Sequence, residues 1–317
     1  MDIHETDPPP LIAGFWRRLG AFALDGIFLG IIGLAAGFLF TPVFVNLGAA
    51  GRLVGFAVAL AYFGLLNSRL TNGQTPGKRL LKIRVVTSDH TPLSVTKSFL
   101  RFIPLGAPWF MNNACAAASP ALTLWHYFAS VVAFGIGLSI VYLYVFNRRT
   151  RQSLHDLLAG TFVVASSVEG RIPSSKPWRM HWAACTVLLL VSGVVPLVLS
   201  EMMASEPLAS MTSLYRAVVT EPSVVSATIA RGRGIVSSAR NGRSEVAYLN
   251  LIAHVNTPDI GNVEIARHLA RLAIATDAAI SAVDVVRVTL VYGYDIGIAS
   301  SWRSQTYAHS PQEWSAQ

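Results

Sequence analysis

Residues 19–40 read LGAFALDGIFLGIIGLAAGFLF and decide the class of protein. The stretch contains a single charged side chain, that of Asp25. A helix needs about 20 apolar residues to cross the hydrocarbon layer of a bilayer, so these residues predict a first membrane-spanning helix, which Thr41 and Pro42 should end. The stretch is too long for the apolar core of a cleavable signal peptide. We therefore expect an integral membrane protein.

Four further segments extend this pattern. Residues 47–66, 125–146 and 182–199 are long and apolar enough to span a bilayer. Residues 99–118 are apolar but contain Arg101, Pro104 and Pro108, so they could form a kinked span, a re-entrant hairpin or an interfacial helix. The sequence thus predicts an α-helical membrane protein of about five transmembrane or re-entrant helices, followed by a small soluble α+β domain.

The charge distribution predicts the orientation. Residues 68–98 hold six Lys or Arg and one acid, and residues 147–181 hold six Lys or Arg and two acids. Short basic loops stay in the cytoplasm, and both loops can do so only if residues 99–146 cross the membrane twice or not at all. Since residues 125–146 form a clear span, residues 99–118 should cross as well. We expect five spans, a cytoplasmic N-terminus with a disordered tail at residues 1–10, and an extracytoplasmic C-terminal domain.

Three motifs in residues 11–166 resemble those of the RDD family of bacterial membrane proteins. They are AGFWRRLGAF at residues 13–22 leading to Asp25, GQTPGKRLLKIRVV at residues 73–86, and RQSLHDLLAGTFVV at residues 151–164. The arginine and two aspartates of the family name map onto Arg18 (with Arg17 as the alternative), Asp25 and Asp156. The resemblance implies a location in the bacterial inner membrane. Transport, including sodium/proton exchange, has been suggested for some members. Residues 201–317 lie outside the resemblance.

Asp25 is the sharpest single candidate for a functional residue. A charged side chain inside a span is costly and usually faces protein or water. Arg18 lies two helical turns earlier on the same face, and Arg101 could lie at a similar depth, so we expect an ion pair of Asp25 with Arg101 or Arg18. Such a pair could simply lock the helices together, or it could handle ions or protons. Together with Asp156, these residues form the predicted buried charge network.

The loop between the second and third segments carries the cations Lys78, Arg79, Lys82 and Arg84. They could be solvated charges that fix the topology, or they could bind anionic lipid headgroups at the cytoplasmic face. Alternating apolar residues at 81–85 predict a half-exposed strand, and residues 161–165 predict a second strand that could pair with it.

His155 and Asp156 lie on a predicted short helix, residues 152–159, that Gly160 should stop. Consecutive helical residues point about 100° apart, so we do not expect these two side chains to orient each other as a catalytic dyad. An interaction of Asp156 with Arg18 or with cations of the basic loops is the favoured interpretation. The sequence offers no nucleophile motif, and we do not expect an enzyme.

The chain divides into a membrane domain at residues 11–166, a basic cytoplasmic linker at 167–181, a last span at 182–200 and an outer domain at 201–317. In the outer domain we expect a helical stalk at 202–220, strands at 228–238, 245–256, 285–292 and 297–308, and an amphipathic helix at 263–279 packed on one face of an antiparallel sheet. Asn241-Gly242 is a hairpin-turn signal. The aromatic residues could build a binding surface or fill the core of the sheet; they are Tyr292, Tyr294, Trp302, Tyr307 and Trp314.

Charge and composition narrow the possible functions. Residues 1–200 carry a net charge of +9 and residues 201–317 a net charge of −1, so the basic character belongs to the membrane part and does not indicate nucleic-acid binding. Neither Cys115 nor Cys185 has metal or redox spacing, and we expect buried thiols with no cofactor or metal. Two classes remain open: ion or small-solute transport, and a non-catalytic membrane-anchored protein whose residues 201–317 bind a protein partner.

Overall fold

The computed structural model describes residues 12–112, 124–167, 177–204, 208–238 and 242–316. These form two compact units. The first is built mainly from the described residues of 1–35 and 52–197, and the second mainly from those of 198–295 and 300–317. The predicted tail at residues 1–10, Cys115 and Asn241 lie outside the described residues.

Within the described residues, three helical stretches are long and apolar enough to cross a membrane: residues 15–66, 124–146 and 179–202. The first consists of α1 (Phe15–Leu47), the short η1 (Gly48–Ala50) and α2 (Gly51–Leu66). Its 52 residues would extend about 78 Å as one straight helix, more than twice the hydrocarbon thickness. The chain turns back instead, so that α1 and α2 pack against each other.

The side-chain contacts show that α1 and α2 run antiparallel. Phe22 stacks on Phe63 with ring centroids 5.9 Å apart, and Leu29, deeper in α1, shares a buried cluster with Ala59, which lies earlier in α2. The predicted break of the first helix at Thr41–Pro42 is present: Phe40, directly before it, has a non-helical backbone conformation. A second helical segment follows this kink and continues to Leu47, because a proline in the first turn of a helix costs no hydrogen bond.

The rest of the first unit alternates helices with two short strands. Its elements are η2 (Arg69–Thr71), α3 (Pro76–Leu80), β1 (Ile83–Thr87), α4 (Val95–Met111), α5 (Leu124–Ser130), η3 (Val131–Ile136), α6 (Gly137–Phe146), α7 (Leu154–Ala159), β2 (Thr161–Ala165) and α8 (Arg179–Ala204). α5, the π-helical η3 and α6 form one continuous helix over the predicted span at residues 125–146. α4 is shorter, about 25 Å long at 1.5 Å per residue.

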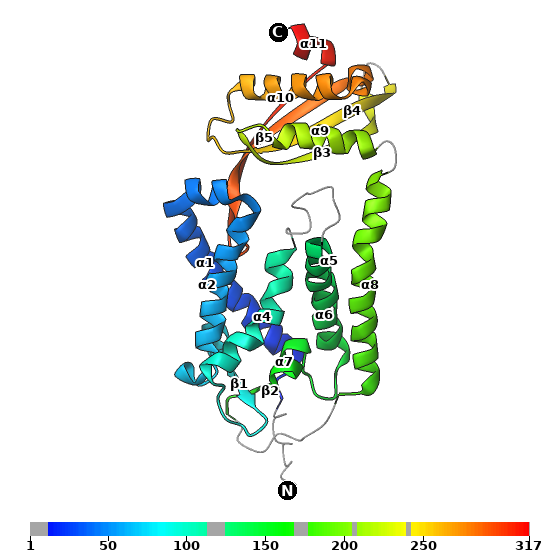
Figure 1. Ribbon diagram of the computed structural model, residues 1–317. Helices are drawn as coiled ribbons and strands as arrows, with labels where there is room; N and C mark the ends of the chain where they lie inside the picture. The colour runs from blue at the N-terminus through cyan, green and yellow to red at the C-terminus, as the bar shows by residue number, and fades with distance from the viewer. Residues whose placement is uncertain (1–11, 113–123, 168–176, 205–207, 239–241, 317) are drawn as a thin grey trace. The chain divides into compact units, whose positions relative to one another are not determined.

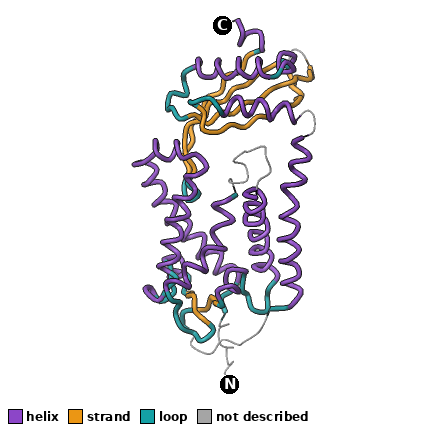
Figure 2. The backbone as a smooth tube through the Cα atoms, in the orientation of Figure 1, coloured by secondary structure: helices purple, strands orange, loops and turns teal. Residues whose placement is uncertain are grey.

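Strands β1 and β2 pair antiparallel, with Ile83 opposite Ala165 and Thr87 opposite Thr161, as the alternating pattern predicted. The chain just before α1 joins the other edge of β2, because the N–H of Ala13 donates to the carbonyl of Val163 at 2.9 Å. Figure 1 places β1, β2 and α7 at one end of the helices, and Figure 2 shows the small sheet there in orange. The segment before α1 and the two basic loops therefore meet at the same end of the unit.

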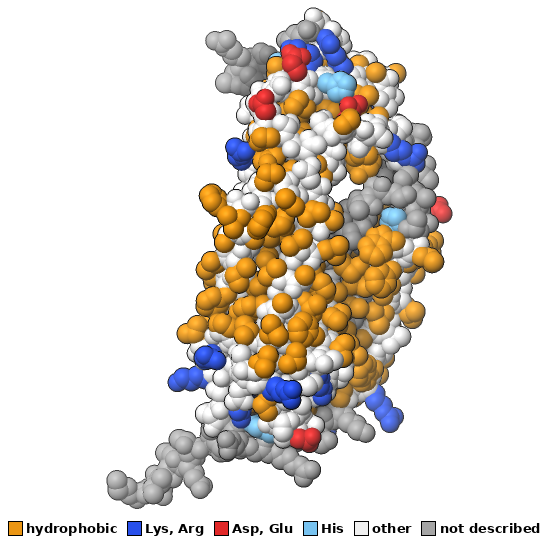
Figure 3. All heavy atoms as spheres, turned by 60° about the vertical axis from the view of Figure 1, so that its left-hand side comes forward, with side chains coloured by type: hydrophobic (Ala, Val, Ile, Leu, Met, Phe, Trp, Pro, Cys, Tyr) orange, Lys and Arg blue, Asp and Glu red, His pale blue; other side chains and the backbone are white. Residues whose placement is uncertain are grey.

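Figure 3 shows hydrophobic side chains spread over the helices of the first unit, with Lys and Arg gathered at its lower end. Many of these large apolar side chains are exposed, Leu124 by 88% and Leu190 by 67% of their surface. A water-soluble protein rarely exposes so large a continuous apolar surface. The first unit is therefore a membrane-type helical region.

The second unit contains α9 (Leu208–Val219), β3 (Val224–Ser238), β4 (Gly242–Val255), α10 (Val263–Thr276), η4 (Ala278–Ala282), β5 (Val285–Asp295), β6 (Ser300–His309) and α11 (Pro311–Ala316). The strands form one sheet in the order β3-β4-β5-β6. The predicted strands, hairpin and amphipathic helix are present. The predicted antiparallel sheet is wrong at its centre, since β4 and β5 pair parallel. The reason is that α10 carries the chain from the end of β4 back to the end at which β4 began.

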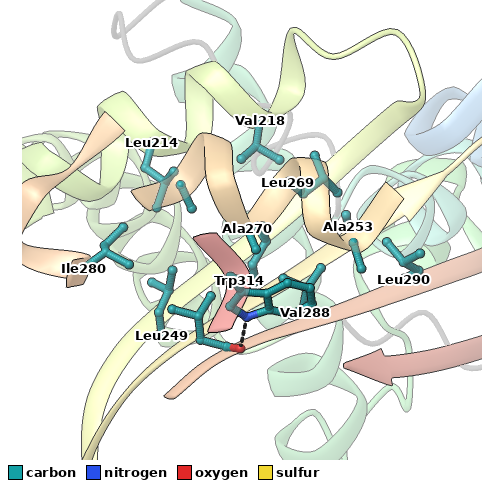
Figure 4. Packing of buried hydrophobic residues seen from close by; sticks show 14 of the residues in the cluster. Leu214, Val218, Leu249, Ala253, Leu269, Ala270, Ile280, Val288, Leu290 and Trp314 are labelled. Carbon is teal, nitrogen blue, oxygen red and sulfur yellow. Dashed lines mark hydrogen bonds between the residues drawn. The ribbon is translucent and has the colours of Figure 1, made fainter. Parts of the chain in front are cut away.

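The core of this unit lies between the sheet and the two helices α9 and α10, as Figure 4 shows. Leu214 and Val218 of α9 are fully buried against it, so the predicted stalk at residues 202–220 is also wrong: α8 continues to Ala204, and α9 is part of the domain. Trp314 of α11 is fully buried, and its Nε1 donates to the carbonyl of Val286 at 3.0 Å.

Candidate functional site

Asp156 lies at the centre of a buried ion cluster. It has no exposed surface and sits in the first turn of α7, where Ser153 and Asp156 form a capping box. Arg18 of α1 contacts its Oδ2. Arg101 of α4 donates to its Oδ1 from Nη2 at 2.6 Å and from Nε at 3.0 Å. One carboxylate therefore joins α1, α4 and α7, and the contact of Asp156 with Arg18 confirms the favoured interpretation of this residue.

The neighbouring basic side chains determine the charge state of Asp156. Burial by itself would raise the pKa of this carboxyl group, but His155, Arg101 and Arg18 together outweigh burial and hold the pKa well below its usual range. Thr161, the first residue of β2, adds a neutral contact: the Nε of Arg101 also donates to its hydroxyl at 3.2 Å. The carboxylate of Asp156 is thus ionised at neutral pH, and several groups around it contribute hydrogen bonds to the cluster.

Asp25 occupies a separate pocket of polar donors, also with no exposed surface. Its Oδ1 accepts from the hydroxyl of Tyr62 and from the backbone N–H of Gly77, each at 2.9 Å. Its Oδ2 accepts from the hydroxyl of Thr75 at 2.5 Å. The predicted ion pair of Asp25 with Arg101 or Arg18 is wrong, because both arginines contact Asp156 instead. Asp25 fastens α1 to α2 and to the start of α3.

The Thr75-Pro76-Gly77 sequence explains how α3 reaches Asp25. Thr75 is the N-cap of α3, and Pro76 occupies the first helical turn, where its missing N–H costs nothing. A Cβ atom at position 77 would lie 2.2 Å from the backbone oxygen of Ala21 and 2.9 Å from Oδ1 of Asp25. Only glycine lets the backbone of α3 approach α1 closely enough for this hydrogen bond.

Lys78 turns inward beside these two aspartates. Its Nζ donates to Oδ1 of Asn67 at 2.8 Å and lies 5.7 Å from the centre of the Phe63 ring. Its hydrogen-bond partners among the described residues are neutral oxygens. Burial and, next, the positive charge of Arg101 lower the pKa of Lys78 to about 7, although Asp25 and Asp156 act in the opposite direction.

The cluster as a whole contains three cationic side chains, Arg18, Arg101 and Lys78, and two carboxylates, Asp25 and Asp156. With Lys78 protonated, it holds one positive charge in excess; with Lys78 neutral, its charges balance. Because an uncompensated buried charge is costly, the proton on Lys78 is the one that the cluster can most readily give up.

The other cations of the predicted cytoplasmic-face set do not behave alike. Arg79 and Lys82 are exposed, as surface or lipid-facing cations should be. Arg84 is partly buried and contacts Nε2 of His90 at 3.0 Å. Lys78 does not belong with them, because its ammonium group points into the protein.

His155 lies next to Asp156 and is itself buried. Its Nε2 is 3.5 Å from Oδ1 of Asp156, an electrostatic contact at the long limit of a hydrogen bond. The carboxylate of Asp156 turns back toward the start of α7, where the N–H of Ser153 donates to it at 3.4 Å. Burial, reinforced by Arg101 and Arg18 and opposed by Asp156, lowers the pKa of His155 to about 3.

The sequence interpretation did not single out Tyr62, Asn67, Thr75 and Thr161 as site residues. The N-cap pattern of a threonine before Pro-Gly was the available signal for Thr75. The other three carry no signal, since a single polar residue at a helix end or strand start is common. Among the described residues, no group of three or more His, Cys, Asp or Glu side chains could hold a metal ion.

Comparisons with known proteins fit this geometry. The sequence profile of the RDD family matches residues 12–160, the region that supplies all five charged residues of the cluster. A relative, the uncharacterised protein YckC of Bacillus subtilis (strain 168), is 30% identical over 151 residues, which cover 48% of this chain and 83% of that protein. The chain belongs to the RDD family. No solved structure matches it.

The cluster accounts for the spacing of the RDD motifs. Arg18 from the first motif and Asp156 from the third contact each other across 138 residues, and the second motif brings Thr75, Gly77 and Lys78 to Asp25. Arg17, the alternative to Arg18, is exposed and donates to backbone carbonyls near β1. Residues beyond 160, including α9 and all that follows it, lie outside the family match.

The second unit has one sheet face that neither α9 nor α10 covers. Asn250 and His254 of β4 and Arg287 and Thr289 of β5 alternate with the core residues and so point to this face. Trp302 of β6 is 46% exposed and meets His254 edge-on, with ring centroids 5.0 Å apart. The predicted aromatic group therefore divides: Trp314 and Tyr292 are buried, whereas Trp302 is available at the surface.

Proposed function

We propose that this RDD protein couples the protonation of its buried charge cluster to the movement of an ion or small solute across the bacterial inner membrane. The observation that supports the proposal is the placement of Lys78. Its ammonium group sits beside two arginines and two carboxylates, and its hydrogen-bond partners within the described ranges are neutral oxygens. A purely structural ion pair would need no third, unpaired cation at this position.

The chemistry follows from the charge balance. Loss of the proton from Lys78 leaves a neutral cluster, and its return adds a positive charge that Asp25 and its three donors must accommodate. Because Asp25 fastens α1 to α2 and α3, a change in its charge environment changes how strongly these helices are held together. Proton exchange near neutral pH would thus bias the packing of the helices through which the solute moves.

The topology that we propose has five spans, with the N-terminus and both basic loops in the cytoplasm. The pairing of β1 with β2, and of Ala13 with β2, supports a common side for these segments, and their positive charge favours the cytoplasm. α4 is then the outward crossing that the helix at residues 124–146 requires. α8 leads out, so the second unit is extracytoplasmic. A reporter fused after Gln317 tests this, since cytoplasmic reporter activity contradicts it.

A flux assay tests the function. The purified chain is reconstituted into vesicles that contain a pH indicator, and proton movement is followed after sodium or potassium gradients are imposed between pH 6 and pH 8.5. We expect flux in the parent protein, loss of its pH dependence in Lys78→Met, and no rescue by Lys78→Arg, which cannot release a proton in this range. Lys97→Gln is the control, because Lys97 is a partly exposed lysine in the first turn of α4, close in sequence to the loop that carries Lys78.

The assay has outcomes that contradict the proposal. Folded, inserted protein that shows no flux under either gradient excludes sodium- or potassium-linked proton movement. Equal flux and equal pH dependence in Lys78→Met and Lys97→Gln would show that the cluster is only a structural lock.

The open sheet face of the second unit favours a second candidate function, a non-catalytic interaction protein whose outer domain binds a partner protein. The exposed ring of Trp302, which meets His254 edge-on, is the supporting observation, because exposed aromatic side chains are enriched at interface hot spots. Crosslinking in cells, compared between the parent protein and Trp302→Ala, tests it. This function requires crosslinked partners that the variant loses.

A further inference from the structure

A cleft lies where α2 ends and α3 begins. Its volume is about 520 Å³, and it is lined by Leu66, Thr71, Gln74, Pro76, Arg79 and Leu80. Two of the polar groups are already engaged: the hydroxyl of Thr71 donates to the carbonyl of Leu66 at 2.6 Å, and Nε2 of Gln74 donates to the carbonyl of Ile83 at 3.1 Å. The cleft therefore offers an apolar lining together with the exposed guanidinium group of Arg79.

Two further cations lie close to one another, Arg17 in the first turn of α1 and Lys82 just after α3. Nη2 of Arg17 donates to the carbonyl of Leu81 at 2.6 Å and to that of Lys82 at 3.3 Å, so Arg17 is held against the residues that follow α3. Arg17 and Lys82 are exposed. Large apolar side chains are exposed beside these cations as well, Leu80 by 65% and Trp16 by 78%.

The combination of an apolar lining with nearby cations indicates which class of ligand the cleft would bind. A water-soluble anion would gain nothing from Leu66, Leu80 and Pro76, and a neutral lipid would gain nothing from Arg79. A phospholipid with an anionic headgroup uses both, since its phosphate matches the guanidinium fork and its acyl chain covers the leucines. The cleft also sits at the end of α2, where apolar helix gives way to basic loop, the depth at which headgroups lie.

We propose that this cleft is a binding site for an anionic phospholipid, with Arg79 on the phosphate, Arg17 and Lys82 beside it, and the start of an acyl chain against Leu66 and Leu80. The basic set expected from the sequence changes accordingly. Lys78 points to the buried cluster and Arg84 contacts His90, so neither faces the lipid, whereas Arg17 joins the set. The proposal does not depend on the proposed transport function.

Native mass spectrometry of the full chain, released from detergent, tests the site. The probes are dioleoyl phosphatidylglycerol, dioleoyl phosphatidylcholine and glycerol 3-phosphate. We expect bound phosphatidylglycerol in preference to phosphatidylcholine, with a dissociation constant about fivefold weaker in Arg79→Gln, since one basic residue near an anionic surface contributes about 1 kcal/mol. Leu80→Gln should weaken binding as well, because it makes the lining polar.

Arg149→Gln is the matched control, an exposed arginine of the other basic loop that should leave lipid binding unchanged. Unchanged thermal unfolding of each variant shows that the fold is intact, as expected for exposed side chains. Equal binding of the two lipids, or equal losses in Arg79→Gln and Arg149→Gln, would overturn the proposal. Displacement of the lipid by millimolar glycerol 3-phosphate would also overturn it, because it would indicate a site for soluble phosphate.

Discussion

Replacement of Asp156 by asparagine should destabilise the membrane unit strongly. The carboxylate is fully buried and is the acidic partner of two buried guanidinium groups, those of Arg18 and Arg101. Asparagine keeps the shape and one acceptor oxygen but removes the negative charge, so two cations remain buried without compensation. Removing one partner of a buried ion pair costs about 3–5 kcal/mol. For a unit of this size, that loss lowers the midpoint of thermal unfolding by about 6–20 °C.

The assay is thermal unfolding of the full chain in a mild detergent, followed by intrinsic tryptophan fluorescence. Asp89→Asn is the control, since Asp89 is an exposed carboxylate on the adjacent basic loop and its loss should change the midpoint by less than about 2 °C. Arg101→Gln combined with Asp156→Asn should cost less than the sum of the single changes, because the double variant leaves only one unpaired cation. An Asp156→Asn midpoint equal to that of Asp89→Asn would refute the idea that this carboxylate holds the helices together.

Three further outcomes follow from the structure. Gly77→Ala should lower the unfolding midpoint and the yield of folded protein, because its Cβ would clash with the backbone of α1. Gly26→Ala is the control and should leave both quantities unchanged, since nothing lies within 4 Å of its new Cβ. The two variants are compared by their yield after solubilisation in detergent and by their unfolding midpoints. His155 stays neutral in the folded protein but becomes protonated below pH 6.5 when unfolded, so folding stability is lost as the pH falls toward 3. The loss is about 2 kcal/mol at pH 5, and His155→Phe should weaken the dependence of the midpoint on pH; an unchanged dependence counts against the buried neutral imidazole. Trp314→Ala should cost about 3–5 kcal/mol and expose the outer domain to limited proteolysis, while Trp302→Ala, at a side chain 46% exposed, should not; similar cleavage of the two would contradict the assigned core.

The sequence was most informative where one physical requirement dominates. Apolar length identified the helical membrane region, and alternation identified β1. The stop signal at Gly160 placed the end of α7. The contact of Asp156 with Arg18 followed from the need to compensate a buried acid.

The failures share a different cause. The partner of Asp25 could not be deduced, because a buried carboxylate is satisfied equally well by hydroxyl and amide donors as by a guanidinium group, and only the tertiary arrangement of α2 and α3 decides between them. The same holds for Lys78, whose sequence neighbours suggest a surface cation. The parallel pairing of β4 and β5 depends on the path of α10, which periodicity does not specify.

Arg18 and Asp156, which contact each other in the folded protein, are synthesised at different times. A ribosome adds roughly 5–20 residues per second, so the acid that neutralises this arginine emerges about 7–28 s after it, once several intervening segments have been delivered to the bilayer. Until then α1 must stay inserted while the guanidinium group of Arg18 is solvated at the level of the lipid headgroups. Biogenesis of the native helix packing therefore cannot be completed before the late loop is made, and truncations that stop short of it should leave an inserted but loosely assembled intermediate for quality-control proteases to remove.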